Sequence, residues 1–445
     1  MTILSILLFI PLFGQIATAI NLIVRNTSSG PVTGFSDRDT PNVAQFLGIP
    51  YAESPVHERR WLPPIPKTEV ENINATVFGN NCPQFLPNIP TINTEDTPEF
   101  NVPQDSRTGE DCLSLSIWAP KDHSNKNAAL PVLIWLYGGG FYTGGVDIPY
   151  QNPSSWIEKS QKHIVVAVNY RGNIFGFPNA AGLKSDERNL GLLDQRLALE
   201  FVRSNIATFG GDPDRLTLWG FSSGAMSVDY YNFAYYEDPI VRGLIMHSGT
   251  AEIELSSPAS DHSNFTYVAS HFGCGNLSAQ AEVDCLRNTS ADDIIEFIEN
   301  EYNTGAVPSL AFSYVVDNRT VFANYTERAL SGKSAKIPAI IGTATNEGEA
   351  FTAYNKTYGP DKAEADFYTL GTFLCPSVKT TQDRYAAGLT TYRYLYGGNF
   401  SNISPQWWEG AYHGSDLPMV FGTSGIANGP STALELDVSA KMQDY

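Results

Sequence analysis

Basic residues are scarce in this sequence of 445 residues. Lysine and arginine together number 28 against 47 aspartates and glutamates, which gives a formal net charge of −19. Such an excess of negative charge repels nucleic acid phosphates and anionic lipid surfaces. We therefore expect no nucleic acid partner, whereas a neutral small molecule meets no such barrier.

The sequence has no cysteine and histidine spacing typical of a zinc site. After residue 19 it also has no apolar segment of the about 20 residues that a membrane span needs. The sequence also shows no internal repeat and no low-complexity linker. A hydrophobic content of 42% with 12% aromatic residues is typical of a globular enzyme. We expect one large domain over residues 20–445, with no integral membrane span and no metal or organic cofactor.

The N-terminus carries a candidate export signal. Residues 1–19 read MTILSILLFIPLFGQIATA, an apolar run that ends in an A-x-A pattern at Ala17 and Ala19, although no Lys or Arg precedes the run. The pattern predicts a secretory signal peptide cleaved after Ala19, and a membrane anchor is the alternative. Ten N-x-S/T sequons fit a secreted, extracellular glycoprotein. They lie at Asn26, Asn74, Asn264, Asn276, Asn288, Asn318, Asn324, Asn355, Asn399 and Asn402.

Strand-like apolar runs alternate with helical segments along the chain. One such helical segment, at residues 193–206, reads LDQRLALEFVRSNI. This alternation favours an α/β fold with a mostly parallel central sheet and helices on both faces. The strand-like runs are VLIWLY, IVVAVNY, RLTLW, GLIMH, AIIGT and TYRYLY.

A serine in a G-x-S-x-G pentapeptide follows one of these runs. Residues 215–224 read RLTLWGFSSG, which places Ser222 between Gly220 and Gly224, with the helix-compatible AMSVDYYNFA directly after it. A nucleophilic serine of an ester hydrolase needs such a tight turn between strand and helix. A glycine-rich turn without catalytic function is the simpler alternative.

Three glycines, Gly138, Gly139 and Gly140, follow an earlier apolar run in PVLIWLYGGGFYTGG. Glycines let backbone N–H groups turn toward a ligand, where they can stabilise the oxyanion of a tetrahedral intermediate. We interpret this segment as a candidate oxyanion hole, with a flexible turn as the alternative.

A triad in the order Ser, acid, His also needs a histidine well after the serine. Of the seven histidines, only His413, in GAYHGSDLPMVFG, leaves room for an acid element before it. Glu347, between Asn346 and Gly348, directly follows the strand-like run AIIGTA and is a candidate acid. Four other carboxylates remain open as rivals at this point: Glu349, Asp361, Asp366 and Asp416.

The ordered set of motifs resembles the type-B carboxylesterases, an α/β-hydrolase family that includes cholinesterases and fungal lipases. The matching strings run from about residue 45 to 422: FLGIPYAESP, EDCLSLSIW, WLYGGGFYTGG, VVAVNYRGNIFGF, NLGLLDQRLALEFVRSNIATFGGDP, GFSSG, IGTATNEGEAF and GAYHGSDLPMVFG. The resemblance implies a secreted serine hydrolase that cleaves small-molecule carboxylic esters through an acyl-enzyme. The implied site residues are Ser222 as nucleophile, Glu347 as acid, His413 as base, and the amides of Gly139, Gly140 and Ser223 as oxyanion donors.

The resemblance also implies structural pairs. It implies disulfides between Cys82 and Cys112 and between Cys274 and Cys285, a salt bridge between Arg60 and Glu110, and a hydrogen bond from Ser248 near the triad. Cys375 is then left over from five cysteines, and we expect it to be a buried small hydrophobic side chain.

Two departures from the family pattern concern the substrate. Phe221 stands where the family usually has glutamate before the nucleophile, and the loop from Cys82 to Cys112 contains no tryptophan. Both changes remove groups that favour a cation, so we expect a neutral ester rather than a choline ester. The loop also lacks a long amphipathic helix, which favours an esterase over an interfacial lipase.

Two further departures concern the fold. The connection from Glu347 to His413 is several dozen residues shorter than is usual in the family, which can misplace His413. The end of the chain, ALELDVSAKMQDY, resembles only the start of the last helix, so the C-terminal part has the pattern of a truncated domain or an incomplete gene product. The alternative function is a catalytically inactive adhesion or binding protein on the same fold.

Overall fold

The computed structural model describes residues 21–122, 129–254 and 261–444. The predicted signal peptide lies outside the described residues. Within the described part of the chain, one sheet of 11 strands forms the centre of the molecule. The strands are β1 (Asn21–Thr27), β2 (Gly30–Ser36), β3 (Val43–Pro50), β4 (Ile73–Asn74), β5 (Ser114–Pro120), β6 (Leu130–Leu136), β7 (Ile164–Val168), β8 (Gly211–Phe221), β9 (Gly243–His247), β10 (Ala339–Ala344) and β11 (Thr391–Tyr396).

The strand order is β1-β2-β3-β5-β7-β6-β8-β9-β10-β11, with β4 paired to β2. The neighbours from β7 to β11 along this path are parallel, whereas the pairs from β1 to β7 are antiparallel. Strand β7, IVVAV, is buried at every position, as expected for a parallel strand covered on both faces. The prediction of a mostly parallel sheet is confirmed.

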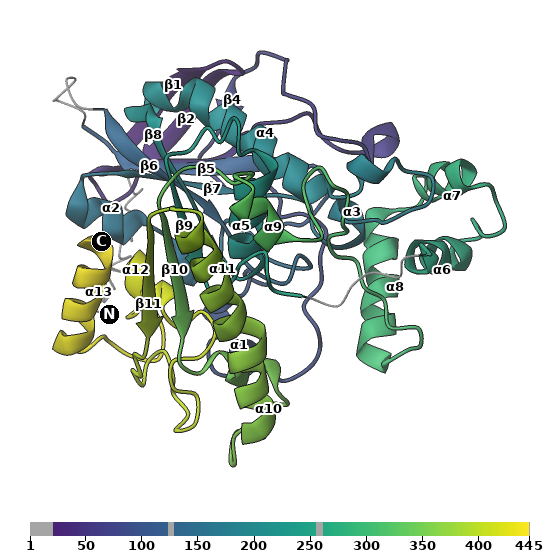
Figure 1. The fold of residues 1–445 in the computed structure, drawn as a ribbon. Helices are drawn as coiled ribbons and strands as arrows, with labels where there is room; N and C mark the ends of the chain where they lie inside the picture. Colours follow the sequence, from purple (N-terminus) through teal and green to yellow (C-terminus); the bar gives the residue numbers. More distant parts are fainter. Residues whose placement is uncertain (1–20, 123–128, 255–260, 445) are drawn as a thin grey trace, which may run out of the picture.

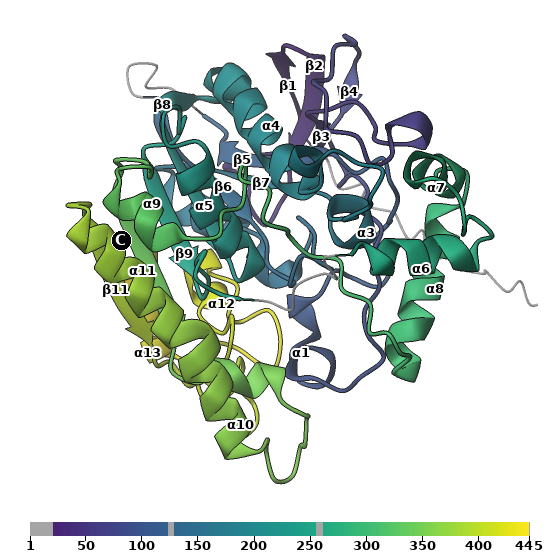
Figure 2. The same ribbon diagram turned by 45° about the vertical axis from the view of Figure 1, so that its right-hand side comes forward.

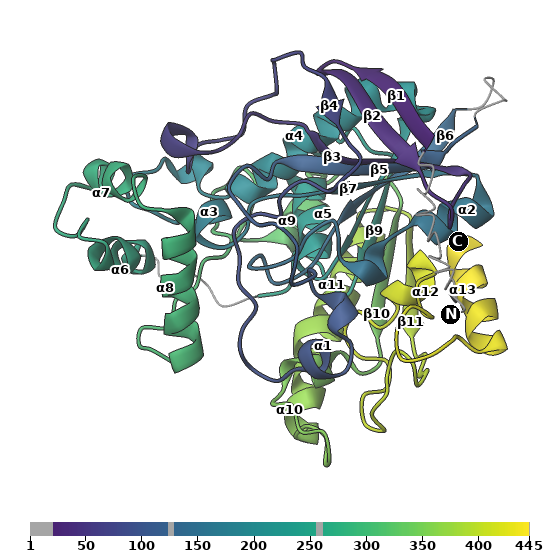
Figure 3. The ribbon, with the colours of Figure 1, turned by 180° about the vertical axis from the view of Figure 1, so that it is seen from behind.

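Helices cover both faces of the sheet (Figures 1 and 3). Helices α4, α5, α9 and α11 lie on one face, and α2, α12 and α13 lie on the other. The α-helices are α1 (Ile92–Glu95), α2 (Ser154–Ser160), α3 (Asn173–Gly176), α4 (Leu190–Asn205), α5 (Ser223–Ala234), α6 (Ser263–His271), α7 (Ala279–Leu286), α8 (Ala291–Thr304), α9 (Tyr325–Leu330), α10 (Lys362–Phe367), α11 (Cys375–Ala386), α12 (Leu417–Phe421) and α13 (Ala433–Asp444). Short 3-10 helices are η1 (His57–Arg59), η2 (Pro98–Phe100), η3 (Pro149–Gln151), η4 (Ser185–Glu187), η5 (Ile206–Phe209) and η6 (Glu347–Phe351), and η7 (Tyr368–Leu374) is a π-helix.

Figure 2 shows α10, η7 and α11 as one continuous helical rod beside the sheet. Helices α6, α7 and α8 instead lie to one side, away from the strands (Figures 1 and 3). Helix α8 buries Ile294, Ile295 and Ile298 on one side, the spacing of an amphipathic helix, and Gly305 ends it in a left-handed conformation. These helices share a second apolar cluster with Trp61, distinct from the core around the sheet.

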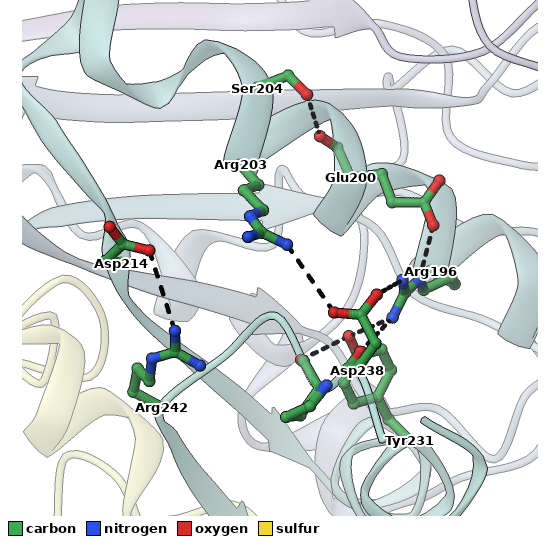
Figure 4. A network of polar contacts seen from close by, with 9 residues as sticks. Arg196, Glu200, Arg203, Ser204, Asp214, Tyr231, Asp238 and Arg242 are labelled. Atoms are coloured by element: carbon green, nitrogen blue, oxygen red, sulfur yellow. Dashed lines mark hydrogen bonds and ion pairs between the residues drawn. The ribbon is translucent and has the colours of Figure 1, made fainter. Parts of the chain in front are cut away.

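An ion-pair network on the surface joins α4 to α5 and to the segment that follows it (Figure 4). The Arg196 guanidinium lies 2.7 Å from Glu200 Oε1 and 2.7 Å from Asp238 Oδ2, and it donates to the hydroxyl of Tyr231 over 3.0 Å. Because Tyr231 belongs to α5, these contacts hold that helix against α4.

None of the described helices is both long and apolar enough to cross a lipid bilayer. The described helices lie within residues 21–122, 129–254 and 261–444.

Candidate active site

Ser222 occupies a sharp turn between β8 and α5. Its φ of 53° and ψ of −123° form a backbone conformation that residues other than glycine rarely adopt. A Cβ at Gly220 would collide with the carbonyl of Gly224, and one at Gly224 would collide with the carbonyl of Leu136. The amide of Ser222 donates to the carbonyl of His247 over 2.8 Å. The pentapeptide glycines are therefore required by close backbone contacts, and they hold the serine in its strained turn.

The glycine-rich segment after β6 runs directly beside this turn. A Cβ at Gly138 would lie 2.9 Å from Cβ of Ser222. Gly139 and Gly140 have φ values of 106° and 65°, in the left-handed region that favours glycine. Ser223 is the first residue of α5, where backbone N–H groups lack partners within the helix. Ser223 thus adjoins Ser222 at the start of α5, and Gly138, the residue before Gly139, lies beside the serine side chain.

Glu347 and His413 form a short hydrogen bond. His413 Nδ1 lies 2.6 Å from Glu347 Oε2, and the other carboxylate oxygen accepts from the hydroxyl of Ser248 and the amide of Ala344, each over 2.6 Å. Glu347 is fully buried. A carboxylate can only accept, so Nδ1 carries the imidazole proton, and Nε2 keeps a lone pair. Among the described residues, buried Nε2 of His413 has no hydrogen-bond partner.

Three of the four rival carboxylates are engaged elsewhere. Glu349 accepts from the side-chain amide of Asn346 over 2.9 Å, and burial raises its pKa although that hydrogen bond lowers it. Asp361 accepts from a backbone amide in the first turn of α10, and Asp366 pairs with a surface lysine of the same helix. Glu347 is the carboxylate that these contacts leave for the histidine.

The fourth rival, Asp416, bonds to a different histidine. Its Oδ2 lies 2.8 Å from Nδ1 of His247. Burial acts to raise the pKa of Asp416, but the His247 charge and the hydrogen bonds of His247 and Tyr394 outweigh it and hold this pKa below its usual value. The sequence pattern did not indicate His247 as the catalytic base, because His247 follows Ser222 too closely. No sequence pattern indicated Tyr394.

Aromatic rings surround the imidazole of His413. Ring centroids of Phe221, Phe351 and Phe373 lie 4.6, 4.9 and 4.6 Å from it. The sequence drew attention to Phe221 alone. Phe351 lies four residues after Glu347 and could have been found from that spacing, whereas Phe373 comes from the π-helix η7, which no sequence pattern indicated.

The short connection between Glu347 and His413 still brings the two residues together. The amide of Gly348 donates to the hydroxyl of Thr369 in η7 over 2.9 Å. Phe373, one turn later, packs on the imidazole. The π-helix therefore supports both members of the pair, and the short connection does not separate His413 from Glu347.

The disulfide loop from Cys82 to Cys112 is bound to the segment that precedes His413. Asp96 accepts from the hydroxyl of Tyr354 and from Nε2 of Gln406, both over 2.7 Å. Within this loop the only described α-helix is α1, with four residues. The expectation of no long amphipathic helix there is confirmed.

Beside Asp96, burial raises the pKa of Glu409 to about 8. The amide of Gln406 acts against this shift, and the charge of Asp96 adds to it. Glu409 is fully buried, and a hydrogen bond between its carboxyl group and Asp96 also raises this pKa. A neutral carboxylic acid is therefore expected four residues before His413 at neutral pH.

The structure contains both expected disulfides, Cys82 to Cys112 and Cys274 to Cys285. Arg60 also binds Glu110 through two 2.6 Å contacts. The expectation for Cys375 is wrong, because this cysteine is unpaired and exposed. It is the first residue of α11, on the solvent side of the helical rod. Over the described residues, no three His, Cys, Asp or Glu side chains are grouped as metal ligands.

Comparisons with known proteins give concordant results. The model of the carboxylesterase family matches residues 21–369, a span that ends before His413. Secreted lipase 5 of Gibberella zeae is 45% identical over 94% of this chain and 83% of its own length. Chlorogenic acid esterase of Aspergillus niger is 46% identical over 94% of this chain and 80% of its own length. Lipase 4 of Diutina rugosa is 30% identical over 88% of this chain and 76% of its own length.

Proposed function

Since this chain belongs to the carboxylesterase family and is a carboxylic ester hydrolase, we propose that it works through a Ser222, His413 and Glu347 triad. The observation that carries the proposal is the 2.6 Å bond from His413 Nδ1 to Glu347, with Nε2 left unpartnered. That arrangement leaves a basic nitrogen available on an imidazole that packs on Phe221, the residue before Ser222.

In the proposed reaction, Ser222 Oγ attacks the acyl carbon while His413 Nε2 takes the hydroxyl proton. The amides of Gly139, Gly140 and Ser223 stabilise the oxyanion, and each such donor is worth about 3 kcal/mol of barrier. His413 then protonates the leaving alcohol. Water attacks the acyl-enzyme by the same proton transfers and releases the acid. Glu347 holds the imidazole tautomer and stabilises its protonated form.

No hydrogen bond joins Ser222 Oγ to His413 Nε2 in the structure. Catalytic hydrogen bonds are often long without substrate and tighten in the complex. The two residues are nevertheless connected through Phe221, whose ring contacts the imidazole and whose backbone precedes Ser222. We propose that the contact between Ser222 and His413 forms when substrate binds.

We also propose that the substrate is a neutral, water-soluble ester and that the protein is secreted. The apolar ring of Phe221 near His413 and the small α1 support a soluble ester over a lipid interface. The relatives include both a chlorogenic acid esterase and lipases, so the acyl and alcohol groups are open to experiment. The two disulfides and the sequence of residues 1–19 support export.

Rapid mixing with p-nitrophenyl esters of graded chain length tests the acyl-enzyme. We expect a burst of p-nitrophenol equal to the enzyme concentration, followed by slower turnover, and no burst in Ser222→Ala. Activity that persists in Ser222→Ala contradicts the mechanism. A rate that rises sharply only above the solubility limit of the ester would shift the proposal from esterase to interfacial lipase.

A further inference from the structure

A second histidine and carboxylate pair lies behind the candidate triad. His247 Nδ1 lies 2.8 Å from Asp416 Oδ2, and the hydroxyl of Tyr394 donates to the same oxygen over 2.8 Å. Tyr394 and His247 also contact each other directly. Asp416 is 2% exposed and His247 is 4% exposed, so water contributes little to these groups. The mechanism proposed above uses none of the three side chains.

The sheet register brings these side chains together. His247 in β9 is paired with Gly342 in β10, and Gly342 is paired with Tyr394 in β11. A Cβ at position 342 would collide with the ring of Tyr394. The absence of a side chain on the middle strand thus lets the tyrosine reach across β10 to His247 and Asp416.

Two members of the cluster, His247 and Asp416, are linked to residues of the candidate triad. The carbonyl of His247 accepts from the amide of Ser222, and the residue after His247 is Ser248, which donates to Glu347. Asp416 follows His413 by three residues and begins the buried helix α12. The segment that carries His413 is therefore held at one end by Glu347 and at the other by the cluster.

A buried polar pair contributes little net stability, because desolvation of the two groups offsets their attraction. Its geometric effect is larger, since a displacement of about 1 Å in a catalytic group can reduce a rate by on the order of a hundredfold. Directional hydrogen bonds to one carboxylate oxygen define the position of Asp416 more narrowly than apolar packing would. The location of the pair, three residues from the candidate base, makes that effect relevant to catalysis.

We propose that Asp416, held by His247 and Tyr394, is a positioning residue that sets the location of His413 for proton transfer. This inference rests on the proposed function of Ser222 and His413. The cluster touches neither substrate nor reacting atoms in this account. Its contribution is to the rate of the chemical steps and not to substrate binding.

The test compares Asp416→Asn, Tyr394→Phe and Gly342→Ala with the wild type on p-nitrophenyl butyrate. We expect kcat per folded molecule to fall by about tenfold or more in Asp416→Asn, with KM within about twofold. Tyr394→Phe removes one hydrogen bond and has a smaller loss of the same kind. Gly342→Ala changes no polar group but displaces the tyrosine, so it is expected to match Tyr394→Phe.

Two readouts separate positioning from a purely structural role. The control Glu110→Gln breaks the Arg60 pair, which is also largely buried, and is expected to lower stability while kcat stays unchanged. The strongly deshielded Nδ1 proton of His413, observed by NMR, is expected to shift in Asp416→Asn and in Tyr394→Phe but not in Glu110→Gln.

Wild-type kcat and an unshifted proton resonance in Asp416→Asn would overturn the inference. Should Asp416→Asn fail to fold, a wild-type kcat and an unshifted Nδ1 proton resonance in Tyr394→Phe overturn the inference. Failure of the underlying mechanism is recognised separately, because His413→Ala would then keep its activity. A loss in His413→Ala with no loss in the cluster variants leaves the triad standing and removes the inference alone.

Discussion

The phenyl ring of Phe221 lies 4.6 Å from the imidazole of His413, centroid to centroid, at an interplanar angle of 37°. Phe221 is also the residue immediately before Ser222. An apolar ring therefore packs on the candidate base and directly precedes the candidate nucleophile in the chain. This relationship makes the substrate preference testable with one substitution.

Phe221→Glu is expected to favour cationic esters. A carboxylate near the substrate attracts a positive charge by roughly 1 to 4 kcal/mol at about 4 Å, depending on the local dielectric. The measurement is kcat/KM for butyrylthiocholine divided by that for its uncharged dimethylbutyl analogue. We expect this ratio to rise about tenfold in Phe221→Glu. Phe221→Gln is the matched control, and an equal rise in both variants would contradict a role for charge.

Glu347→Gln is expected to lower kcat by about a thousandfold or more, because the amide favours the wrong imidazole tautomer. The matched control is Glu349→Gln, two residues away, whose side chain bonds to Asn346 instead of the histidine. We expect the control to retain activity within about threefold. The reverse pattern, with Glu349→Gln inactive and Glu347→Gln active, would transfer the acid role to Glu349.

Ser248→Ala removes the 2.6 Å hydrogen bond to Glu347 Oε1. Loss of one partner from a buried charged group costs about 1 to 3 kcal/mol, so we expect kcat to fall by about tenfold with KM unchanged. Ser116→Ala serves as control, because this buried hydroxyl accepts from the amide of Gly48 between β5 and β3, strands that do not adjoin the Glu347 segment. Equal activity of both variants with the wild type would show that Ser248 does not orient the acid.

Glu409 makes stability depend on pH. Its pKa is raised from 4.5 to about 8 in the folded protein. The folded state therefore binds more protons than the unfolded state between these values, and the stabilising contribution is complete below about pH 4.5 and lost as the pH rises through about 8.

We expect the free energy of unfolding to fall by up to about 1.4 kcal/mol per pH unit in this window, and Glu409→Gln to remove that part of the slope. Urea unfolding at a series of pH values measures it. Glu364→Gln, an exposed glutamate in α10, is the control and should keep the wild-type slope. An identical slope in Glu409→Gln would mean that Glu409 does not titrate in this range.

Much of the fold follows from local sequence. The runs GLIMH and TYRYLY have the same bounds as β9 and β11, because apolar and aromatic runs without breakers define short strands. The sequence also predicted the turn at Ser222, because two glycines at fixed spacing indicate close backbone contacts there. The Glu347 to His413 pair required the family resemblance, because rival carboxylates were not distinguishable by spacing.

Other features depend on contacts that no local pattern encodes. The cluster of His247, Asp416 and Tyr394 arises from the register of three strands and a glycine between two of them. Phe373 reaches His413 from the π-helix η7, which no sequence pattern indicated. The exposure of Cys375 follows from which side of that same rod faces the solvent.

Labelling with a fluorophosphonate tests the central claim most directly, because the reagent reacts with a serine only when a base and an oxyanion hole activate it. Mass spectrometry of the digested protein identifies the modified residue. The account predicts one phosphonyl group per molecule, located on Ser222, with labelling abolished in Ser222→Ala and strongly slowed in His413→Ala. A folded wild-type protein that remains unlabelled, or that is labelled at a different serine, would contradict it.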